Sequence, residues 1–194
     1  MTKLLIGCFF LICPIFLFAH NPLSAKYYLE HNEKGTFLSV YLSQTGVDKA
    51  LNKKYGQETI RQKTALEYKE LLVQYIKSNF NLNIDNQKIE LLDGGIKLGN
   101  HQTDLKFILS PFAKDIETIN INISAFQENE KHQTIFSYNL YGLVDKAILS
   151  HKNDYTATII LNEEKKDSKT LLVSSSIGVV VLLLLLGLFV KNRT

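Results

Sequence analysis

The sequence predicts a mainly β, α+β fold: an antiparallel β-sandwich with a helical insertion after the first hairpin, plus one C-terminal transmembrane helix. Three observations lead to this prediction. Short segments that alternate apolar and polar residues dominate residues 80–160, as strands with one buried face do. Two segments with helix-start signals lie between residues 45 and 79. An uncharged, largely apolar segment, 171–190, lies near the end of the chain.

Residues 1–19 have the features of a secretory signal peptide. Lys3 precedes an apolar stretch from Leu4 to Phe18, and the small residue Ala19 stands at the expected cleavage point. Leu17 is larger than the side chains usual at its place, so a retained N-terminal anchor is the alternative. Cleavage after Ala19 makes His20 the first residue of the exported protein.

The segment 171–190 is long enough to cross a bilayer as a helix and contains no charged residue. Basic residues follow it directly, which is typical of a cytoplasmic end, so residues 191–194 are expected to be a cytoplasmic tail. Residues 162–170 are expected to be a charged juxtamembrane linker. The sequence therefore predicts a single-pass protein of the cell membrane, with residues 20–161 as one extracytoplasmic domain on the periplasmic side.

The exported region is electrically neutral and free of cysteine. The chain has 22 basic and 19 acidic residues, and its excess of basic residues corresponds to Lys3, Lys191 and Arg193 in the flanks. A neutral domain lacks the basic surface with which proteins bind nucleic acid, so no nucleic-acid partner is expected. Cys8 and Cys13 both lie in the leader. No disulfide, thiolate metal site or cysteine nucleophile is therefore expected in the domain.

The domain is expected to begin with a β-hairpin followed by a short helix. Residues Ala25 to His31 and Thr36 to Ser43 alternate aromatic or β-branched side chains with polar ones around the turn NEKG. The next segment, TGVDKALNKKYG, has Thr45 and Asp48 at capping-box spacing and ends on Gly56.

The following segment, TALEYKELLVQYIKSN, is expected to form a second helix. Thr64 and Glu67 again have capping-box spacing. Apolar residues then recur at helical spacing and predict one buried face: Ala65, Tyr68, Leu72, Tyr75 and Ile76.

From Phe80 onward the apolar period becomes two, which predicts about six short strands. The expected strands are FNLNID, KIELLD, TDLKFILS, ETININ, TIFSYNLY and YTATIIL. In the fourth of these, isoleucines at 119, 121 and 123 point to one side and asparagines at 120 and 122 to the other. Such strands usually have one buried face and one face in water.

No motif of nucleophilic catalysis, phosphate binding or calcium binding occurs in the chain, so an enzyme is not expected. The glycine-rich stretch from Asp93 to Asn100 leads into no helix, whereas a phosphate-binding loop needs a helix N-terminus. Two turns explain this stretch better.

Histidine is the residue type through which the domain could bind a transition metal. No two of its five histidines lie within ten residues of each other, and a single histidine is more often an ordinary surface residue. His31 and His151 stand beside expected turns and are assigned no role. His20 differs, because cleavage would give it a free α-amine with a pKa of about 8 beside an imidazole with a pKa of about 6.5. Together these nitrogens could chelate one ion, and copper binds such donors most tightly among common divalent metals.

Several short motifs accompany this histidine along the domain. They are Pro22 and Leu23 after His20, the pair Tyr75 and Ile76, the strand with Leu82 and Ile84, His101 before Phe107, and His132 after Glu128 and Glu130. In these motifs the domain resembles the extracytoplasmic N-terminal region of HupE/UreJ-type membrane proteins, which are regarded as nickel permeases or as accessory proteins of hydrogenase and urease. The chain is also similar to small exported bacterial proteins of unknown function, which share the AH start, here Ala19 and His20, and the segment KKYG, Lys53 to Gly56.

The resemblance implies a metal-handling role, with His20, His101 and His132 as candidate ligands of copper or nickel. The permease part of the family is a bundle of several membrane helices, whereas this chain has one expected span, so transport by this chain alone is not implied. Asn21 also separates the first histidine from Pro22, where the family usually has proline directly.

The function expected from these observations is that of a non-enzymatic, membrane-anchored extracytoplasmic accessory domain. It would assist a membrane transport or metal-handling partner. The alternative is a structural or protein-interaction module whose histidines have no metal role.

Overall fold

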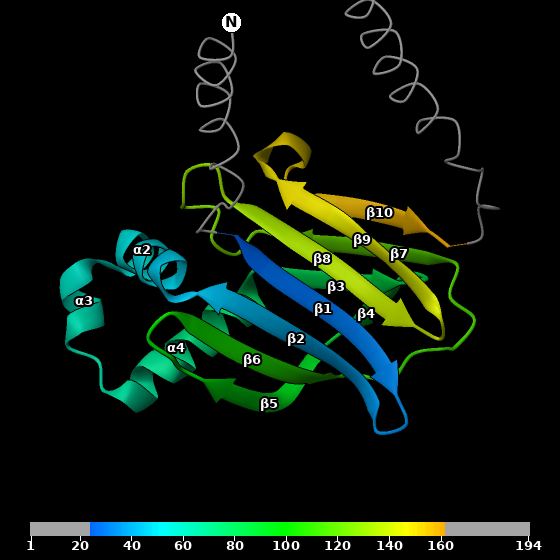
Figure 1. The fold of residues 1–194 in the computed structure, drawn as a ribbon, viewed down its shortest axis with the longest axis horizontal. Helices are drawn as coiled ribbons and strands as arrows, with labels where there is room; N and C mark the ends of the chain where they lie inside the picture. The colour runs from blue at the N-terminus through cyan, green and yellow to red at the C-terminus, as the bar shows by residue number, and fades with distance from the viewer. Residues whose placement is uncertain (1–23, 162–194) are drawn as a thin grey trace, which may run out of the picture. The chain divides into compact units, whose positions relative to one another are not determined.

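The structure, a computed structural model, describes residues 24–161, which form a mainly β, α+β fold with two β-sheets (Figure 1). The expected signal peptide and His20 lie outside the described residues. The same holds for the expected linker 162–170, the transmembrane helix 171–190 and the tail. Between residues 24 and 161, none of the helices has the length and apolar character that a membrane crossing requires.

The first sheet has six strands. In spatial order they are β5 (Leu91–Lys97), β6 (Gln102–Leu109), β2 (Gly35–Ser43), β1 (Ala25–Asn32), β8 (Gln133–Leu140) and β9 (Leu143–Ser150). Neighbours are antiparallel except β1 and β8, which are parallel. The expectation of a purely antiparallel arrangement is therefore wrong at this pair. Between β1 and β8 the chain forms strands of the second sheet. Parallel neighbours need a long connection of this kind.

The second sheet has four antiparallel strands. They are β10 (Thr156–Ile160), β7 (Thr118–Ile123), β3 (Phe80–Ile84) and β4 (Gln87–Ile89). The two sheets pack through their apolar faces. Tyr27 of β1 stacks on Phe80 of β3 with ring centroids 6.1 Å apart, and both sheets contribute to one core cluster.

The predicted alternation in β7 is confirmed. Ile119, Ile121 and Ile123 are buried, while Asn120 and Asn122 are only half-buried. Full burial of an isoleucine side chain stabilises a fold by about 1.5–3 kcal/mol. These three residues alone are therefore a large contribution to a domain that no disulfide supports.

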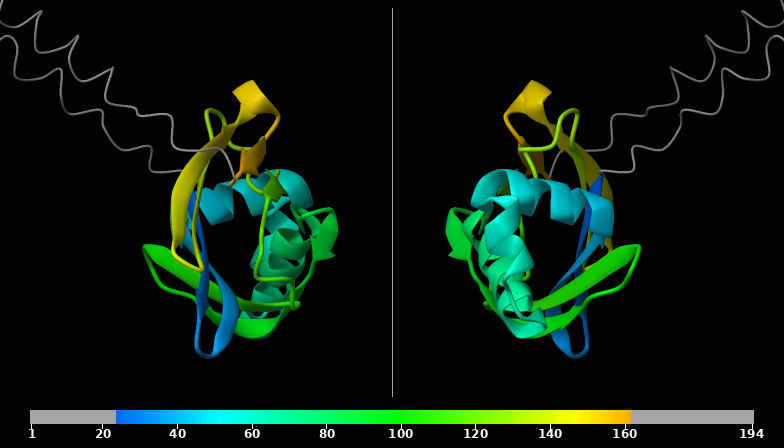
Figure 2. Two further views of the ribbon diagram at one scale, coloured as in Figure 1. Left: turned by 90° about the vertical axis from the view of Figure 1, so that its right-hand side faces the viewer. Right: turned by 90° about the vertical axis from the view of Figure 1, so that its left-hand side faces the viewer.

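Three α-helices and one short 3₁₀ helix occur in residues 24–161: α2 (Gln44–Tyr55), α3 (Gln57–Arg61), α4 (Ala65–Ser78) and η2 (His151–Asn153). Helix α4 lies on the same side of the first sheet as the second sheet does (Figure 2). At its end, the ammonium of Lys77 lies 5.9 Å from the ring centroid of Phe107, a buried residue of β6. The helix thus helps to cover the part of the wider sheet that contains β6.

The two helices expected from the sequence are present, with one correction at a helix start. The N-cap of α2 is Ser43, whose hydroxyl accepts a hydrogen bond from the Gly46 N–H. The predicted box of Thr45 and Asp48 is wrong, because the Asp48 carboxylate accepts hydrogen bonds from the side chains of Gln44 and Tyr68 instead. Helix α3 is an addition that the sequence pattern did not indicate.

Helix α4 begins with the predicted capping box. The Thr64 hydroxyl accepts a hydrogen bond from the Glu67 N–H, and the Glu67 carboxylate accepts one from the Thr64 N–H. The predicted apolar face is confirmed at Leu72, Tyr75 and Ile76, which are buried. It is wrong at the first helical residue, Ala65, which is exposed, and Tyr68 is half-buried.

Two strand predictions differ from the structure. The segment KIELLD belongs to two strands in different sheets, because the chain leaves β4 at Glu90. There the Glu90 N–H donates a hydrogen bond to the Ser110 hydroxyl. Strand β9 has no counterpart in the prediction. Its sequence does not alternate apolar and polar residues, since Leu143 stands beside Val144 and Ile148 beside Leu149.

The outer edge of β9, at the rim of the first sheet, is partly closed by local hydrogen bonds. The Asn153 side chain donates to the Ile148 carbonyl at 2.9 Å and accepts from the Ser150 N–H at 2.8 Å. The Tyr155 N–H donates to the Ser150 carbonyl at 3.0 Å. Open backbone groups at a sheet edge invite pairing with other chains, so these bonds protect the domain from association.

Replacing Asn153 is expected to promote aggregation. Asn153→Ala leaves the Ile148 carbonyl and the Ser150 N–H open, and loss of such a cap costs about 0.5–2 kcal/mol. Light scattering during a thermal ramp should show aggregation beginning at a lower temperature than in the unaltered protein. Lys152→Ala, a change at the neighbouring exposed residue, is the control. An unchanged onset in Asn153→Ala would show that this edge is protected by other means.

Glu67 is expected to make the domain sensitive to acid. Hydrogen bonds from the backbone N–H and then the hydroxyl of Thr64 hold the pKa of this carboxyl below its ordinary value. A lowered pKa in the folded state stabilises the fold above the unfolded-state pKa of about 4.3, and the contribution is lost as the pH falls through the folded-state value.

In Glu67→Gln this acid-dependent contribution should disappear. The midpoint of urea unfolding, followed by circular dichroism from about pH 6 down to about pH 3, should therefore fall less steeply than in the unaltered protein. Glu70→Gln on the same helix is the control. The same slope in Glu67→Gln and the unaltered protein would contradict the assignment.

Candidate functional site

Three described histidines lie at one end of the first sheet. His101 directly precedes β6 and His132 directly precedes β8, and these two strands run in the same direction as β1. His151 follows β9, which runs the opposite way, so it lies at the same end. Ser24, the first described residue, precedes β1 here as well. We call this region the histidine end.

The strand register separates two of the three candidate ligands. Thr103, Leu42, Ala25 and Thr134 pair in a row across β6, β2, β1 and β8. Three steps of about 4.8 Å place the two outer strands about 14 Å apart. His101 and His132 each stand two residues before an outer member of this row. The structure therefore does not bring the backbones of these two histidines together.

His132 occupies a buried position. Its side chain is 2 % exposed, and Nε2 lies 3.0 Å from the Thr134 hydroxyl. The rings of Phe126 and Tyr155 flank the imidazole, with centroids 5.7 and 6.3 Å away. These contacts hold the imidazole inside the domain, as expected of a buried polar side chain that stabilises the fold.

His101 is exposed, and its backbone joins the start of β6 to helix α2. Its carbonyl accepts a hydrogen bond of 3.0 Å from the Gln44 N–H. No described residue hydrogen-bonds its imidazole. A surface pocket of about 490 Å³ is lined by both His101 and Ser24, together with residues of β1 and β2 that include Lys26 and Tyr41. This histidine is accessible to a ligand from solvent.

The two histidines that were assigned no role have ordinary surroundings. His31 lies at the other end of the first sheet, where Nδ1 is 2.8 Å from the Thr36 hydroxyl and the ring contacts Tyr141. His151 is exposed at the start of η2. Across residues 24–161, no group of three or more histidine, cysteine, aspartate or glutamate side chains is arranged to hold a metal ion.

A cluster that sequence reasoning missed joins α4 to the loop before β8. The Tyr75 hydroxyl donates to Glu128 Oε2 at 2.7 Å and accepts a hydrogen bond from the Phe126 N–H. The Lys54 ammonium lies 3.7 Å from Glu128 Oε1 and 4.7 Å from the centroid of the Tyr75 ring. Tyr75 and Glu128 are 53 residues apart in the sequence, so no local pattern announces their contact.

The chemistry of this cluster favours a structural role. Burial, and then the hydrogen bond to Glu128, raise the pKa of Tyr75, so its hydroxyl remains a hydrogen-bond donor near neutral pH. Phe126 has a φ of 68°, a left-handed conformation that bulky residues rarely adopt. The bond from its N–H to Tyr75 helps to hold the loop in this conformation.

The outer face of the first sheet carries exposed apolar side chains. This face points toward the viewer in Figure 1, and no described helix or strand covers it. Tyr41, Ile108, Val144 and Ile148 are between 40 and 67 % exposed. They come from three strands, β2, β6 and β9, so the apolar character extends across the sheet.

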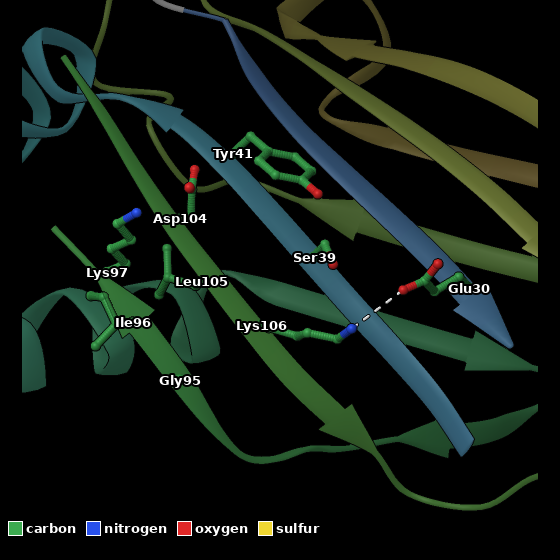
Figure 3. Close-up of a pocket in the computed structure, with 9 residues that line it drawn as sticks. All are labelled: Glu30, Ser39, Tyr41, Gly95, Ile96, Lys97, Asp104, Leu105 and Lys106. Atoms are coloured by element: carbon green, nitrogen blue, oxygen red, sulfur yellow. Dashed lines mark hydrogen bonds and ion pairs between the residues drawn. The ribbon is translucent and has the colours of Figure 1, made fainter. Parts of the chain in front are cut away.

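The same face contains a shallow groove of about 500 Å³ (Figure 3). The small residues Ser39 and Gly95 lie among larger neighbours there, which are Glu30, Tyr41, Ile96, Lys97, Asp104, Leu105 and Lys106. The Lys106 ammonium lies 3.4 Å from Glu30 Oε1 and 4.3 Å from the ring centroid of Phe37. Aromatic side chains are enriched in protein-binding surfaces, and the rim of such surfaces is polar.

Strand β5 packs closely against β6 because of a glycine. A Cβ atom at Gly94 would clash with the backbone carbonyl of Lys106 on β6. The register between the two strands also shifts between Leu91 and Gly94. The stretch DGGIKLGN, interpreted from sequence as turns, is therefore largely strand, and its first glycine serves close strand packing.

A scan of protein-family models and a search of curated proteins both found no match to this chain. The resemblance to the HupE/UreJ-type region stays a prediction.

Removing the Tyr75 hydroxyl is expected to destabilise the domain. Tyr75→Phe leaves the buried Phe126 N–H without its acceptor, which costs about 1–3 kcal/mol in the free energy of unfolding. Chemical denaturation would measure this loss. The control, Tyr41→Phe, removes a hydroxyl from an exposed side chain and should change stability by no more than about 0.5 kcal/mol. Equal stability of the two variants would exclude a structural role for the cluster.

Proposed function

We propose that this protein is a membrane-anchored extracytoplasmic accessory domain that binds copper or nickel and assists a membrane transport or metal-handling partner. The supporting observation is the gathering of chain segments at the histidine end, where β1, β6 and β8 all begin. Ser24 and His101 line one pocket there. His20 precedes Ser24 by four residues, which can span at most about 14 Å. The chain between His20 and Ser24 is therefore long enough to bring His20 to the exposed His101.

The donor set suits copper or nickel better than a harder cation. His20 would supply an α-amine and an imidazole once the leader is removed, and His101 would supply a second imidazole. Nitrogen donors of this kind favour late first-row metals. His132 would join them as a third ligand only by leaving its contact with Thr134. We therefore assign the larger share of the affinity to His20 and His101.

Tethering would keep the domain close to its partner. Leu161 ends the described chain, and the expected membrane helix begins at residue 171. A linker of this length spans at most about 35 Å. The domain would then remain within one domain diameter of the bilayer, where it could contact a transport protein.

A protein-interaction module without metal chemistry is the second candidate. The observation that favours it is the uncovered outer face of the first sheet, with Tyr41, Ile108 and Ile148 exposed on three strands. Side chains of this kind, surrounded by charges, are suited to binding a protein partner. In this case the histidines would be incidental.

Metal titration separates the two candidates. Isothermal titration of the leader-free chain with Cu²⁺ and Ni²⁺ should show one site. His20→Ala and His101→Ala should each weaken it by at least about tenfold, and His132→Ala by less. An additional residue before His20 should act like His20→Ala, because it displaces the α-amine from its chelating position.

His31→Ala, at the opposite end of the sheet, is the matched control and should bind metal as the unaltered chain does. Unchanged affinity in both His20→Ala and His101→Ala would exclude the metal site and leave the interaction module. N-terminal sequencing of the exported protein tests the cleavage on which the α-amine depends.

A further inference from the structure

The outer face of the second sheet carries a regular array of uncharged polar side chains. Six residues form two rows across β3, β7 and β10: Asn81, Asn122 and Thr156 in one row, and Asn83, Asn120 and Thr158 in the other. They line a shallow depression of about 200 Å³. We call this array the Asn/Thr face.

Its composition is unusual for a sheet surface. Asparagine is depleted in strands, yet it occupies four of the six positions. Charged residues make up 21 % of the chain, but none of the six carries a charge, and Lys88 stands beside Asn83 at the end of one row. The outer face of the first sheet differs, since Glu30, Lys97 and Asp104 are among the charged residues at its groove. The two outer faces are therefore suited to different ligands.

The Asn/Thr face has hydrogen-bonding capacity that the described residues leave unused. The Thr158 hydroxyl donates to Asn120 Oδ1 at 2.7 Å, and the Asn122 amide donates to the carbonyls of Asp154 and Tyr155. These contacts fix one side of the array. The side-chain amides of Asn81 and Asn83 have no hydrogen-bond partner between residues 24 and 161. Asn81 is exposed and Asn83 is half-buried.

We propose that the Asn/Thr face binds an uncharged, hydroxyl-rich glycan chain. Each sugar hydroxyl both donates and accepts hydrogen bonds, as does every amide and hydroxyl side chain of the array. The array repeats at about 4.8 Å across the strands and about 6.8 Å along them, so several hydroxyls of one chain can be bound together. Buried isoleucines behind β7 hold it in a fixed geometry, which lowers the entropy cost of binding.

The absence of charge from the six positions argues for a neutral ligand. The six side chains offer no cation to a polyanion such as a uronic-acid polymer and no carboxylate to a polycation, and Lys88 stands beside Asn83. If the domain is exported, as proposed above, this face lies outside the cell and would be exposed to such glycans. Metal binding at the histidine end and glycan binding here involve different residues, so either proposal can fail without the other.

Saturation-transfer difference NMR tests the proposal on the full chain in lipid nanodiscs, which avoid sugar-based detergents. Cellohexaose is the neutral probe, and a hexamer of galacturonic acid is the anionic one. Cellohexaose should show saturation transfer and the anionic hexamer at most a weak signal. Absence of a signal from cellohexaose, or equal signals from both probes, would overturn the proposal.

Paired variants assign the binding to this face. Asn83→Asp combined with Asn120→Asp keeps side-chain shape and the acceptor for Thr158 but adds two negative charges and removes two donors. This double variant should bind cellohexaose at least about tenfold more weakly. Asn139→Asp, at an exposed asparagine of β8 on the first sheet, is the matched control and should bind normally.

Two further measurements test whether the double variant is folded and whether a second copy of the chain occupies the face. Circular dichroism and thermal melting should show that the double variant folds like the control, and a variant with Asn83→Gln alone, which keeps the amide, should retain most of the binding. Analytical ultracentrifugation of the leader-free chain tests whether a second copy occupies the face instead. A dimer that the double variant abolishes would overturn the glycan proposal.

Discussion

Burial of the two inner sheet faces against each other is the constraint on which this domain depends. Both cysteines of the chain lie in the first 19 residues, so no disulfide can limit the unfolded state of residues 24–161. Tyr27 of the first sheet stacks on Phe80 of the second, and the isoleucines of β7 are buried behind them. Apolar burial of this kind is the dominant favourable contribution to folding.

Unequal sheets make the helices necessary. Six strands in the first sheet face four in the second. Helix α4, whose Leu72 and Ile76 are buried in the core, helps to cover the wider sheet, since Lys77 at its end lies over Phe107 of β6. Tyr75 on this helix then fixes the loop that leads into β8 through its bonds to Glu128 and Phe126. That loop precedes His132 and β8, the strand that pairs in parallel with β1.

Alternation within each strand also leaves both outer faces available for binding. Side chains that point away from the core contribute little to packing, so their chemistry can vary with small effects on stability. The first sheet has apolar and charged side chains on this side, including Tyr41 and Ile148. The second has amides and hydroxyls. A single core thus supports a surface suited to a protein partner and one suited to a neutral polar ligand.

The sequence by itself determined the elements whose signals are local. The first hairpin, the capping box of Thr64 and Glu67, and the alternation in β7 follow from neighbouring residues, and these three features are present in the structure. Tertiary structure alone decided which distant segments meet. The parallel pair of β1 and β8, the separation of His101 from His132, the contact of Tyr75 with Glu128 and the two asparagine rows all join residues far apart in the chain. Periodicity specifies which face of a strand is buried but not which strand lies beside it, because pairing is decided by the packing of the whole core.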